Sequence, residues 1–363
     1  MDSEFDFESL VTLCRTTHEE MQGRASRAVD TSLAARNWLF GWYIVEYEQK
    51  GADRAGYGTA LLERLSKELG KGFSVRSLRQ FRSFYLSYKT IRQTVSAELL
   101  SSANELSDSV LQIRQTLSAE LAKGLCLGWS HYVALLMIDS VEERRFYEIE
   151  AAQNGWAVRE LQRQIASSLY ERLALSRDED EIRRLAKEGQ VVEKAADLIK
   201  NPLVLEFLEL EEKPAYSEHE IETAIIDKIE NFLLELGKGF LFEARQKRFS
   251  FDNDHFFVDL VFYNRLLRCY VLIDLKRDKL THQDLGQMQM YVNYFDRYVK
   301  TDDELPAIGI VLCHRKSEAL VELTLPDDAN IFASKYQLYL PSKDELKHQL
   351  ELAQASVDAR TEQ

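Results

Sequence analysis

Apolar residues recur at intervals of three and four through residues 8–172. This spacing places them on one face of successive α-helices, and few stretches alternate in the manner of a β-strand. Residues 176–200 are rich in charge and keep a helical pattern until Asn201-Pro202 interrupts it. The pattern therefore predicts an all-α domain over residues 1–175 and a charged helical connector over residues 176–215.

The pattern changes after residue 214. Ser217 followed by Glu220 is a capping box, and it begins a helix that we expect to end at Gly237 and Gly239. Five apolar or alternating stretches typical of strands follow, at residues 242–251, 255–263, 269–275, 307–313 and 336–340. One further helical stretch, at residues 281–299, lies between the third and the fourth of them. We therefore expect an α+β protein of two domains. Its second domain is an α/β sandwich over residues 216–350, followed by a polar tail over 351–363.

Charge is distributed unevenly along the chain. The 363 residues carry a net charge of −14, which argues against a surface covered with cations for nucleic acid. From Lys71 to Ala97, however, there are six Lys or Arg residues and no Asp or Glu. Since phosphate neutralisation is local, this segment could contact DNA despite the acidic average.

Several classes of protein are excluded by what the sequence lacks. There is no apolar run of 18 residues, so we expect no membrane contact, and the acidic first residues do not resemble a signal peptide. The four cysteines show no metal-ligand spacing and are expected to be free thiols in the cytoplasm. No Walker pattern occurs, and we expect no small-molecule cofactor.

Two acidic residues interrupt strands that are otherwise apolar. Asp274 and Lys276 lie two residues apart in VLIDLK, so their side chains share one face of the strand. Asp259 lies inside the preceding apolar stretch, FFVDLVFY. Unpaired buried carboxylates are costly and repel each other, and a divalent cation would remove both penalties. Mg²⁺, which binds carboxylate and phosphate oxygens, is the expected ion, with Mn²⁺ as a substitute.

A third acid is available from the helix that begins after Ser217. Ile225, Ile229 and Phe232 belong to its apolar stripe. At 100° per residue, Glu222 lies about 20° from Ile229 and therefore faces inward, whereas Glu230 lies about 100° away and is the fallback.

Asp259 followed fifteen residues later by Asp274-Leu275-Lys276 resembles the PD-(D/E)xK nuclease motif. Gln287 and Tyr291 match the QxxxY element found in several branches of that superfamily, and they share a helix face. The stretches FLLELGKGFLFEARQ, GQMQMYVNYFDRYV and IFASKYQLYLP resemble the YhcG family specifically, and GFSVRSLRQFRSFY and LGWSHYVALL resemble its N-terminal domain. Two departures are an Asp at position 274, where the family usually has Glu, and a valine before Asp259 in place of proline.

The resemblance implies a restriction-endonuclease-like fold and metal-dependent hydrolysis of DNA phosphodiester bonds. It implies that Asp259, Asp274 and Glu222 hold the metal and that Lys276 orients a water molecule or neutralises developing charge. Gln287 and Tyr291 would support the site or touch the substrate backbone. The resemblance also favours a homodimer, because many nucleases of this superfamily are dimers. A non-catalytic DNA-binding or assembly protein with a degenerate nuclease fold is the alternative.

The segment LLERLSKELGKGFSVRSLRQFRSFYLSY predicts a helix, a short glycine turn and a second helix. On the second helix Arg76, Arg79 and Arg82 lie opposite an apolar stripe that includes Leu78 and Phe81. Such a helix in a helix-turn-helix enters the major groove of DNA, and the stretch after it resembles ParB-type partition proteins. The alternatives are an ordinary solvated helix face and a module that binds a protein partner.

Overall fold

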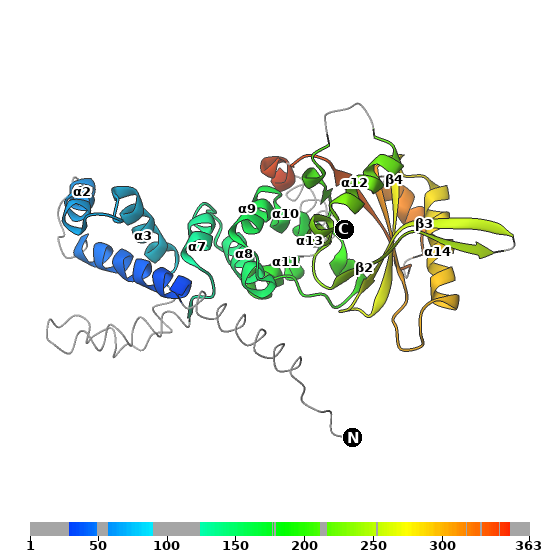
Figure 1. The fold of residues 1–363 in the computed structure, drawn as a ribbon, viewed down its shortest axis with the longest axis horizontal. Coiled ribbons are helices and arrows are strands. Elements are labelled where there is room, and N and C mark those ends of the chain that lie inside the picture. Colours follow the sequence, from blue (N-terminus) through cyan, green and yellow to red (C-terminus); the bar gives the residue numbers. More distant parts are fainter. Residues whose placement is uncertain are drawn as a thin grey trace, which may run out of the picture. The chain divides into compact units, whose positions relative to one another are not determined.

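The structure is a computed structural model. It describes residues 29–48, 57–89, 124–175, 177, 179–210, 216–251, 253–316, 318–326, 329–340 and 342–348. The chain divides into two compact units, Met1–Leu161 and Gln162–Gln363, which are described separately (Figure 1). The division lies within α9 (Val158–Ala166), so α10 (Leu169–Ala174) belongs to the second unit although the sequence pattern assigns it to the helical domain. The polar tail predicted over residues 351–363 lies outside the described residues.

The described part of the first unit is entirely helical, which confirms the all-α prediction there. Its elements are a helix over residues 29–48, α2 (Tyr57–Leu69), α3 (Val75–Ser87), α7 (Trp129–Leu135), α8 (Val141–Asn154) and the start of α9. Aromatic rings form much of the core: Phe84 lies 5.4 Å from Trp129 and 4.8 Å from Tyr132, between ring centroids. These offset and edge-on contacts add to the free energy gained by burying apolar area.

The turn between α2 and α3 forms as the sequence predicts. Gly70 and Gly72 have φ values of 74° and 100°, which a residue without Cβ adopts at no steric cost. Ser74 caps α3 by accepting a hydrogen bond from the amide of Ser77. The buried face of α3 consists of Leu78, Phe81, Phe84 and Tyr85.

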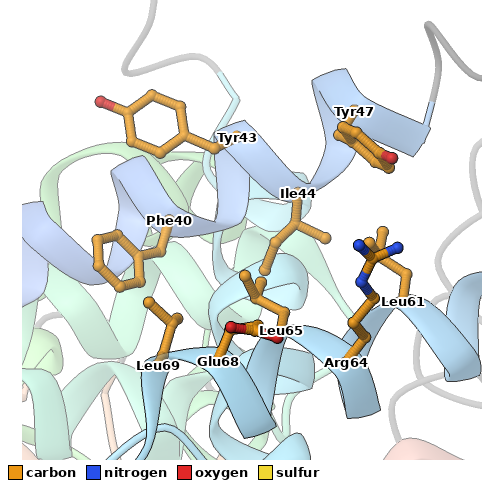
Figure 2. A pocket seen from close by; sticks show the side chains of 9 residues that line it. All are labelled: Phe40, Tyr43, Ile44, Tyr47, Leu61, Arg64, Leu65, Glu68 and Leu69. Atoms are coloured by element: carbon orange, nitrogen blue, oxygen red, sulfur yellow. The ribbon is translucent and has the colours of Figure 1, made fainter.

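An apolar groove of about 440 Å³ lies between the helix over residues 29–48 and α2 (Figure 2). Phe40, Tyr43, Ile44 and Tyr47 line it from the first helix, and Leu61, Leu65 and Leu69 line it from α2. Arg64 and Glu68 are its only charged lining residues among the described side chains, so the groove has no cluster of groups suited to catalysis.

The second unit is built on a six-stranded mixed sheet in the order β1-β6-β5-β4-β3-β2. The strands are β1 (Leu203–Val204), β2 (Phe240–Phe251), β3 (Asp254–Asn264), β4 (Cys269–Lys279), β5 (Ile308–Arg315) and β6 (Ile331–Gln337). β2, β3 and β4 are antiparallel neighbours, whereas β4, β5, β6 and β1 run parallel. Figure 1 shows β2 and β3 extending together as a long hairpin.

Helices cover both faces of this sheet, so the unit has three layers. On one face α12 (Glu218–Asp227) and α13 (Ile229–Leu236) bury Ile225 and Phe232 against Leu260 and Ile273. On the other face α14 (His282–Tyr298) and α15 (Glu318–Thr324) cover the core that includes Met288, Leu272 and Val311. The predicted α/β sandwich is therefore confirmed.

Three local predictions differ from the structure. The single helix expected after Ser217 is broken at Lys228, whose φ and ψ of −121° and 38° are not helical. The last strand spans residues 331–337 rather than 336–340, because the apolar residues before Tyr336 pair with β5. The connector is helical in α11 (Glu179–Glu188) and then contributes β1, which the charge-rich pattern did not indicate. Among the described residues, no helix has the length and hydropathy needed to cross a bilayer.

A buried ionic cluster joins α13 to α9, α10 and β1. Glu235 is fully buried and its carboxylate accepts hydrogen bonds from the Arg172 guanidinium and, at 3.0 Å, from the amide of Val204. Arg163 lies 3.3 Å from the same carboxylate, and the Lys200 ammonium donates to the main-chain carbonyl of Glu235. Burial alone would raise the pKa of Glu235, but the surrounding cations lower it to about 2.

Replacing Glu235 by Gln is expected to lower the free energy of unfolding by about 3 kcal/mol at pH 7, because Arg172 would keep its charge in a buried site without a counterion. The wild-type carboxylate stabilises the fold above the ordinary glutamate pKa of 4.5, and this contribution is lost as the pH falls toward 2. Denaturant unfolding should therefore show the two proteins converging below pH 4.5. Glu230→Gln, an exposed site on the same helix, is the matched control; equal losses in both variants would contradict this account.

Candidate functional site

The candidate site lies where β3 separates from β4. The two strands pair from Asn264 with Cys269 up to Leu260 with Ile273, and the remaining part of β3 pairs only with β2. At this fork the carboxylate of Asp259 takes the place of a main-chain acceptor, because its Oδ2 accepts a hydrogen bond of 2.8 Å from the amide of Leu275. The fork thereby fixes the Asp259 side chain beside the main chain of β4.

Asp274, the neighbour of Leu275 on β4, is brought next to Asp259 by this arrangement. Its side chain is almost fully buried, and the raised pKa of about 7 has two main causes: burial, and then the negative charge of Asp259. Lys276 opposes both effects with its Nζ 2.7 Å from Asp274 Oδ2. Burial is the largest single influence on the pKa of Lys276 and lowers it, but the charge and hydrogen bond of Asp274, together with the charges of Glu218 and Asp259, make the net shift upward.

One oxygen of this pair is a candidate metal ligand. Asp274 Oδ2 is buried and has no hydrogen bond of acceptable geometry, although Lys276 Nζ lies close to it. Two adjacent carboxylates with an unsatisfied oxygen fit the oxygen-ligand preference of Mg²⁺. Within the ranges that the structure describes, no group of three His, Cys, Asp or Glu side chains is arranged to hold a metal ion. The two aspartates of the fork are the described side chains that could hold a cation there.

Glu222 of α12 faces inward, as its helical position predicts, and is buried. Arg245 Nε lies 2.5 Å from Glu222 Oε1, and Gln246 Nε2 lies 2.8 Å from Glu222 Oε2. The same nitrogen of Gln246 lies 3.0 Å from Asp259 Oδ1, so the amide bridges the two acids. Glu222 is therefore adjacent to the aspartate pair through Gln246. The fallback residue Glu230 is exposed on α13.

Arg245 and Gln246 are site residues that the sequence reasoning did not single out. Both lie on β2, next to a β-bulge that shifts the register between Phe242 and Ala244. Gln246 has a φ of 47°, which is rare for a residue with a side chain and turns its amide toward the acids. Neither the bulge nor this dihedral has a signature in the hydrophobic pattern.

Gln287 and Tyr291 lie behind the fork, on α14. Tyr291 is buried and its hydroxyl donates a 2.9 Å hydrogen bond to the carbonyl of Phe257, two residues before Asp259. The Gln287 amide donates to the same hydroxyl. These contacts fix the main chain of β3 in the part that does not pair with β4. They favour a supporting role for Gln287 and Tyr291 over contact with substrate.

The three arginines predicted to contact DNA belong to the first unit. Arg76 and Arg79 are exposed on α3. Arg82 is ion-paired instead, with its Nε 2.8 Å from Glu48 Oε2 on the helix over residues 29–48. The structure therefore leaves Arg76 and Arg79 as the more accessible pair of cations on this helix.

Comparison with known families defines the class. Residues 196–351 match the YhcG PDDEXK nuclease domain, and residues 14–172 match the DUF1016 N-terminal domain. The fork with Asp259, Asp274 and Lys276 lies inside the first match. The C-terminal unit is therefore a nuclease domain of the PD-(D/E)xK class.

The chain belongs to the YhcG family. It is 40% identical over 343 residues to "Putative nuclease YhcG" of Escherichia coli (strain K12), a match that covers 92% of this chain and 90% of that protein. Among solved structures, a repair endonuclease from Pyrococcus abyssi is 21% identical over 36% of this chain and 50% of its own, with a TM-score of 0.25. An EndoMS–dsDNA2 complex is 20% identical over 37% of this chain and 49% of its own, also with a TM-score of 0.25.

The raised pKa of Asp274 predicts that Asp274→Asn stabilises the metal-free protein. A carboxyl whose folded pKa lies above its unfolded value of 3.8 costs stability as the pH rises toward 7, because ionisation is easier in the unfolded chain. The gain from Asn should be small near pH 4, grow up to pH 8, and reach at most about 4 kcal/mol. Thermal unfolding with a chelator across this pH range is the measurement. Asp278→Asn, an exposed position on the same strand, should change little; a pH-independent difference for Asp274→Asn would disprove the assignment.

Proposed function

We propose that this protein is a Mg²⁺-dependent nuclease that hydrolyses DNA phosphodiester bonds at the fork between β3 and β4. The observation that carries the proposal is the juxtaposition of Asp259 and Asp274, with Lys276 2.7 Å from the second carboxylate. A purely structural role does not explain a buried aspartate with a pKa of about 7 next to a second, half-buried aspartate. The 40% identical relative bears the name of a nuclease, which supports the same assignment.

Each residue of the site has a separate role in this proposal. Asp259 and Asp274 would hold the cation, which when bound supplies Lewis-acid stabilisation of the phosphate and an activated water molecule. Lys276 places a positive charge beside Asp274, where it can neutralise charge that develops on the phosphate oxygens. The Gln246 amide donates a hydrogen bond to Asp259 Oδ1, whereas the amide of Leu275 donates to Oδ2. Both oxygens of the Asp259 carboxylate are therefore held in place.

Glu222 as a third metal ligand stays a prediction. Its two oxygens are engaged by Arg245 and Gln246, so direct ligation would require one of these contacts to be exchanged. The contacts favour a role in which Glu222 positions Gln246 and, through it, Asp259. Mn²⁺ as a substitute ion and a homodimeric assembly likewise stay predictions.

Purified protein with Mg²⁺ is expected to cut labelled DNA, and cutting should stop with EDTA and fall at least 100-fold in Asp274→Ala and Lys276→Ala, because each removes charge from the reacting centre. Gel analysis of single-stranded, duplex, flap and junction DNA, with an RNA of the same sequence, gives both the activity and the substrate class. Glu230→Gln is the matched control and should cut like the wild type. Equal cutting by wild type and Asp274→Ala would assign the activity to a contaminant; no cutting by wild type on any substrate would favour the degenerate-nuclease alternative.

We further propose that α3 of the first unit contributes to DNA binding through Arg76 and Arg79. Both side chains are exposed on the helix that follows the glycine turn, opposite the face buried by Leu78 and Phe81. Guanidinium groups so placed can contact phosphates or guanine edges. Arg82 has less freedom to do so, because it pairs with Glu48.

Arg76→Glu with Arg79→Glu is expected to weaken DNA binding by the full-length protein at least tenfold and to reduce its dependence on salt, because two phosphate contacts are replaced by repulsion. Fluorescence anisotropy at several salt concentrations is the measurement. Glu63→Lys with Glu68→Lys on α2 is a charge-reversal comparison that should not weaken binding. If the arginine double variant binds as tightly as the wild type, α3 is a partner-binding or solvated face instead.

A further inference from the structure

The hairpin formed by β2 and β3 extends beyond the fork as an arm. From Lys247 paired with Val258 to Phe251 paired with Asp254, the two strands bond only to each other and not to β4. Figure 1 shows this part of the hairpin projecting away from the remaining strands. An isolated pair of strands needs a reason to stay extended, and here one of its faces rests on a helix.

The two faces of the arm differ in what they contact. Residues directly opposite each other in the hairpin share a face, so the register assigns every side chain. One face packs on α14: Phe249 stacks on Tyr294 with centroids 4.1 Å apart and meets Tyr291 edge-on at 5.5 Å. Lys247 and Phe251 share that face with Phe249, since they lie two residues before and after it.

The opposite face begins at Asp259, one of the two acids of the candidate site. Gln246 and Asp259 lie across from each other at the fork, the next pair outward on the same face is Arg248 with Phe257, and the pair after that is Ser250 with His255. One such interval along a strand is roughly 7 Å. We call this surface, made of Arg248, Ser250, His255 and Phe257, the outer track.

The side chains of the outer track are exposed and partly preordered. Phe257 is 45% exposed, although it is a large apolar ring. Arg248 Nη2 lies 2.9 Å from His255 Nε2, and His255 Nδ1 lies 2.8 Å from Ser250 Oγ. Because a guanidinium only donates, His255 Nε2 must accept, and its Nδ1–H then donates to Ser250. This chain of hydrogen bonds fixes the Arg248 guanidinium beside His255, and the strand register places Arg248 directly opposite Phe257.

An exposed aromatic ring beside a fixed cation suits an unpaired nucleotide better than a protein surface. A base can stack on the ring while the guanidinium contacts the phosphate, and neither contact depends on base identity. Within the described residues, no carboxylate lies within ion-pair distance of Arg248, so its charge is not neutralised internally. The track also leads directly to the acids at which the scissile phosphate would bind.

We propose that the outer track binds an unpaired nucleotide of the substrate next to the scissile phosphate, with Phe257 stacking on its base and Arg248 contacting its phosphate. This inference rests on the proposed nuclease function, because it places the scissile phosphate at Asp259 and Asp274. A base within an intact duplex is already stacked on its neighbours and cannot present its face to Phe257. The track therefore favours substrates with single-stranded character at the cut.

Binding measured in an Asp274→Ala background tests the track without interference from cleavage. Phe257→Ala should weaken binding of a single-stranded oligonucleotide about tenfold and of a fully paired duplex less than twofold, because only the former can stack. Arg248→Ala should weaken binding of the single strand and lower the slope of its salt dependence by about one phosphate contact. Phe257→Trp should restore the affinity for the single strand.

Phe251→Ala and Lys247→Ala are matched controls, since both change the same kinds of residue on the opposite face of the arm. Phe251 is 61% exposed, and Lys247 pairs with Glu243 at 3.3 Å. Both controls should bind DNA like the background protein. The outer track is disproved if Phe257→Ala loses no more affinity than Phe251→Ala, or if it loses affinity for duplex and for single strand equally. Cleavage that depends on Asp274 would still support the nuclease proposal in that case. If wild-type protein never cuts, the nuclease proposal fails while this binding comparison still decides whether the track exists.

Discussion

The separation of β3 from β4 is the constraint on which the candidate site depends. Where the two strands stop pairing, an amide of β4 would lose its acceptor, and the Asp259 carboxylate replaces that acceptor at Leu275. The hydrogen bond that satisfies the sheet thereby brings Asp259 beside the buried Asp274, where burial and the charge of Asp259 raise the pKa of Asp274 to about 7. The same two carboxylates therefore destabilise the metal-free fold and favour binding of a cation, and perturbed groups of this kind are common at functional sites.

The surrounding elements hold the fork from both layers of the sandwich. From α12, Glu222 reaches Asp259 through the Gln246 amide, and from α14, Tyr291 holds the main chain of β3 at Phe257. These supports allow the rest of the β2–β3 hairpin to leave the sheet with one face on α14. On the opposite face of the hairpin the Phe257 ring and the Arg248 side chain stay exposed, in line with Asp259.

Much of this arrangement could be predicted from the sequence, for identifiable reasons. Asp259, Asp274 and Lys276 are conspicuous because charged residues interrupt apolar strands, and the inward position of Glu222 could be predicted from helical periodicity, although the helix is broken at Lys228. The role of Gln246 could not be predicted, because it depends on a β-bulge and on a positive φ, and a glutamine in the sequence indicates neither. The predicted bounds of the last strand were wrong, because apolar residues lie on both sides of Tyr336 and periodicity does not determine the register. Glu235 was missed because its partners Arg163 and Arg172 come from a segment far away in the sequence.

Calorimetric titration of Mg²⁺ into the protein at pH 6.5, repeated in buffers of different ionisation enthalpy, tests the central claim most directly. Since the pKa of Asp274 lies near 7, most of that carboxyl is protonated at this pH, and a cation held by the aspartate pair must displace its proton. The account predicts one binding event that releases up to one proton and that disappears in both Asp259→Asn and Asp274→Asn. Binding without proton release, or binding that survives both substitutions, would show that the fork does not hold the ion.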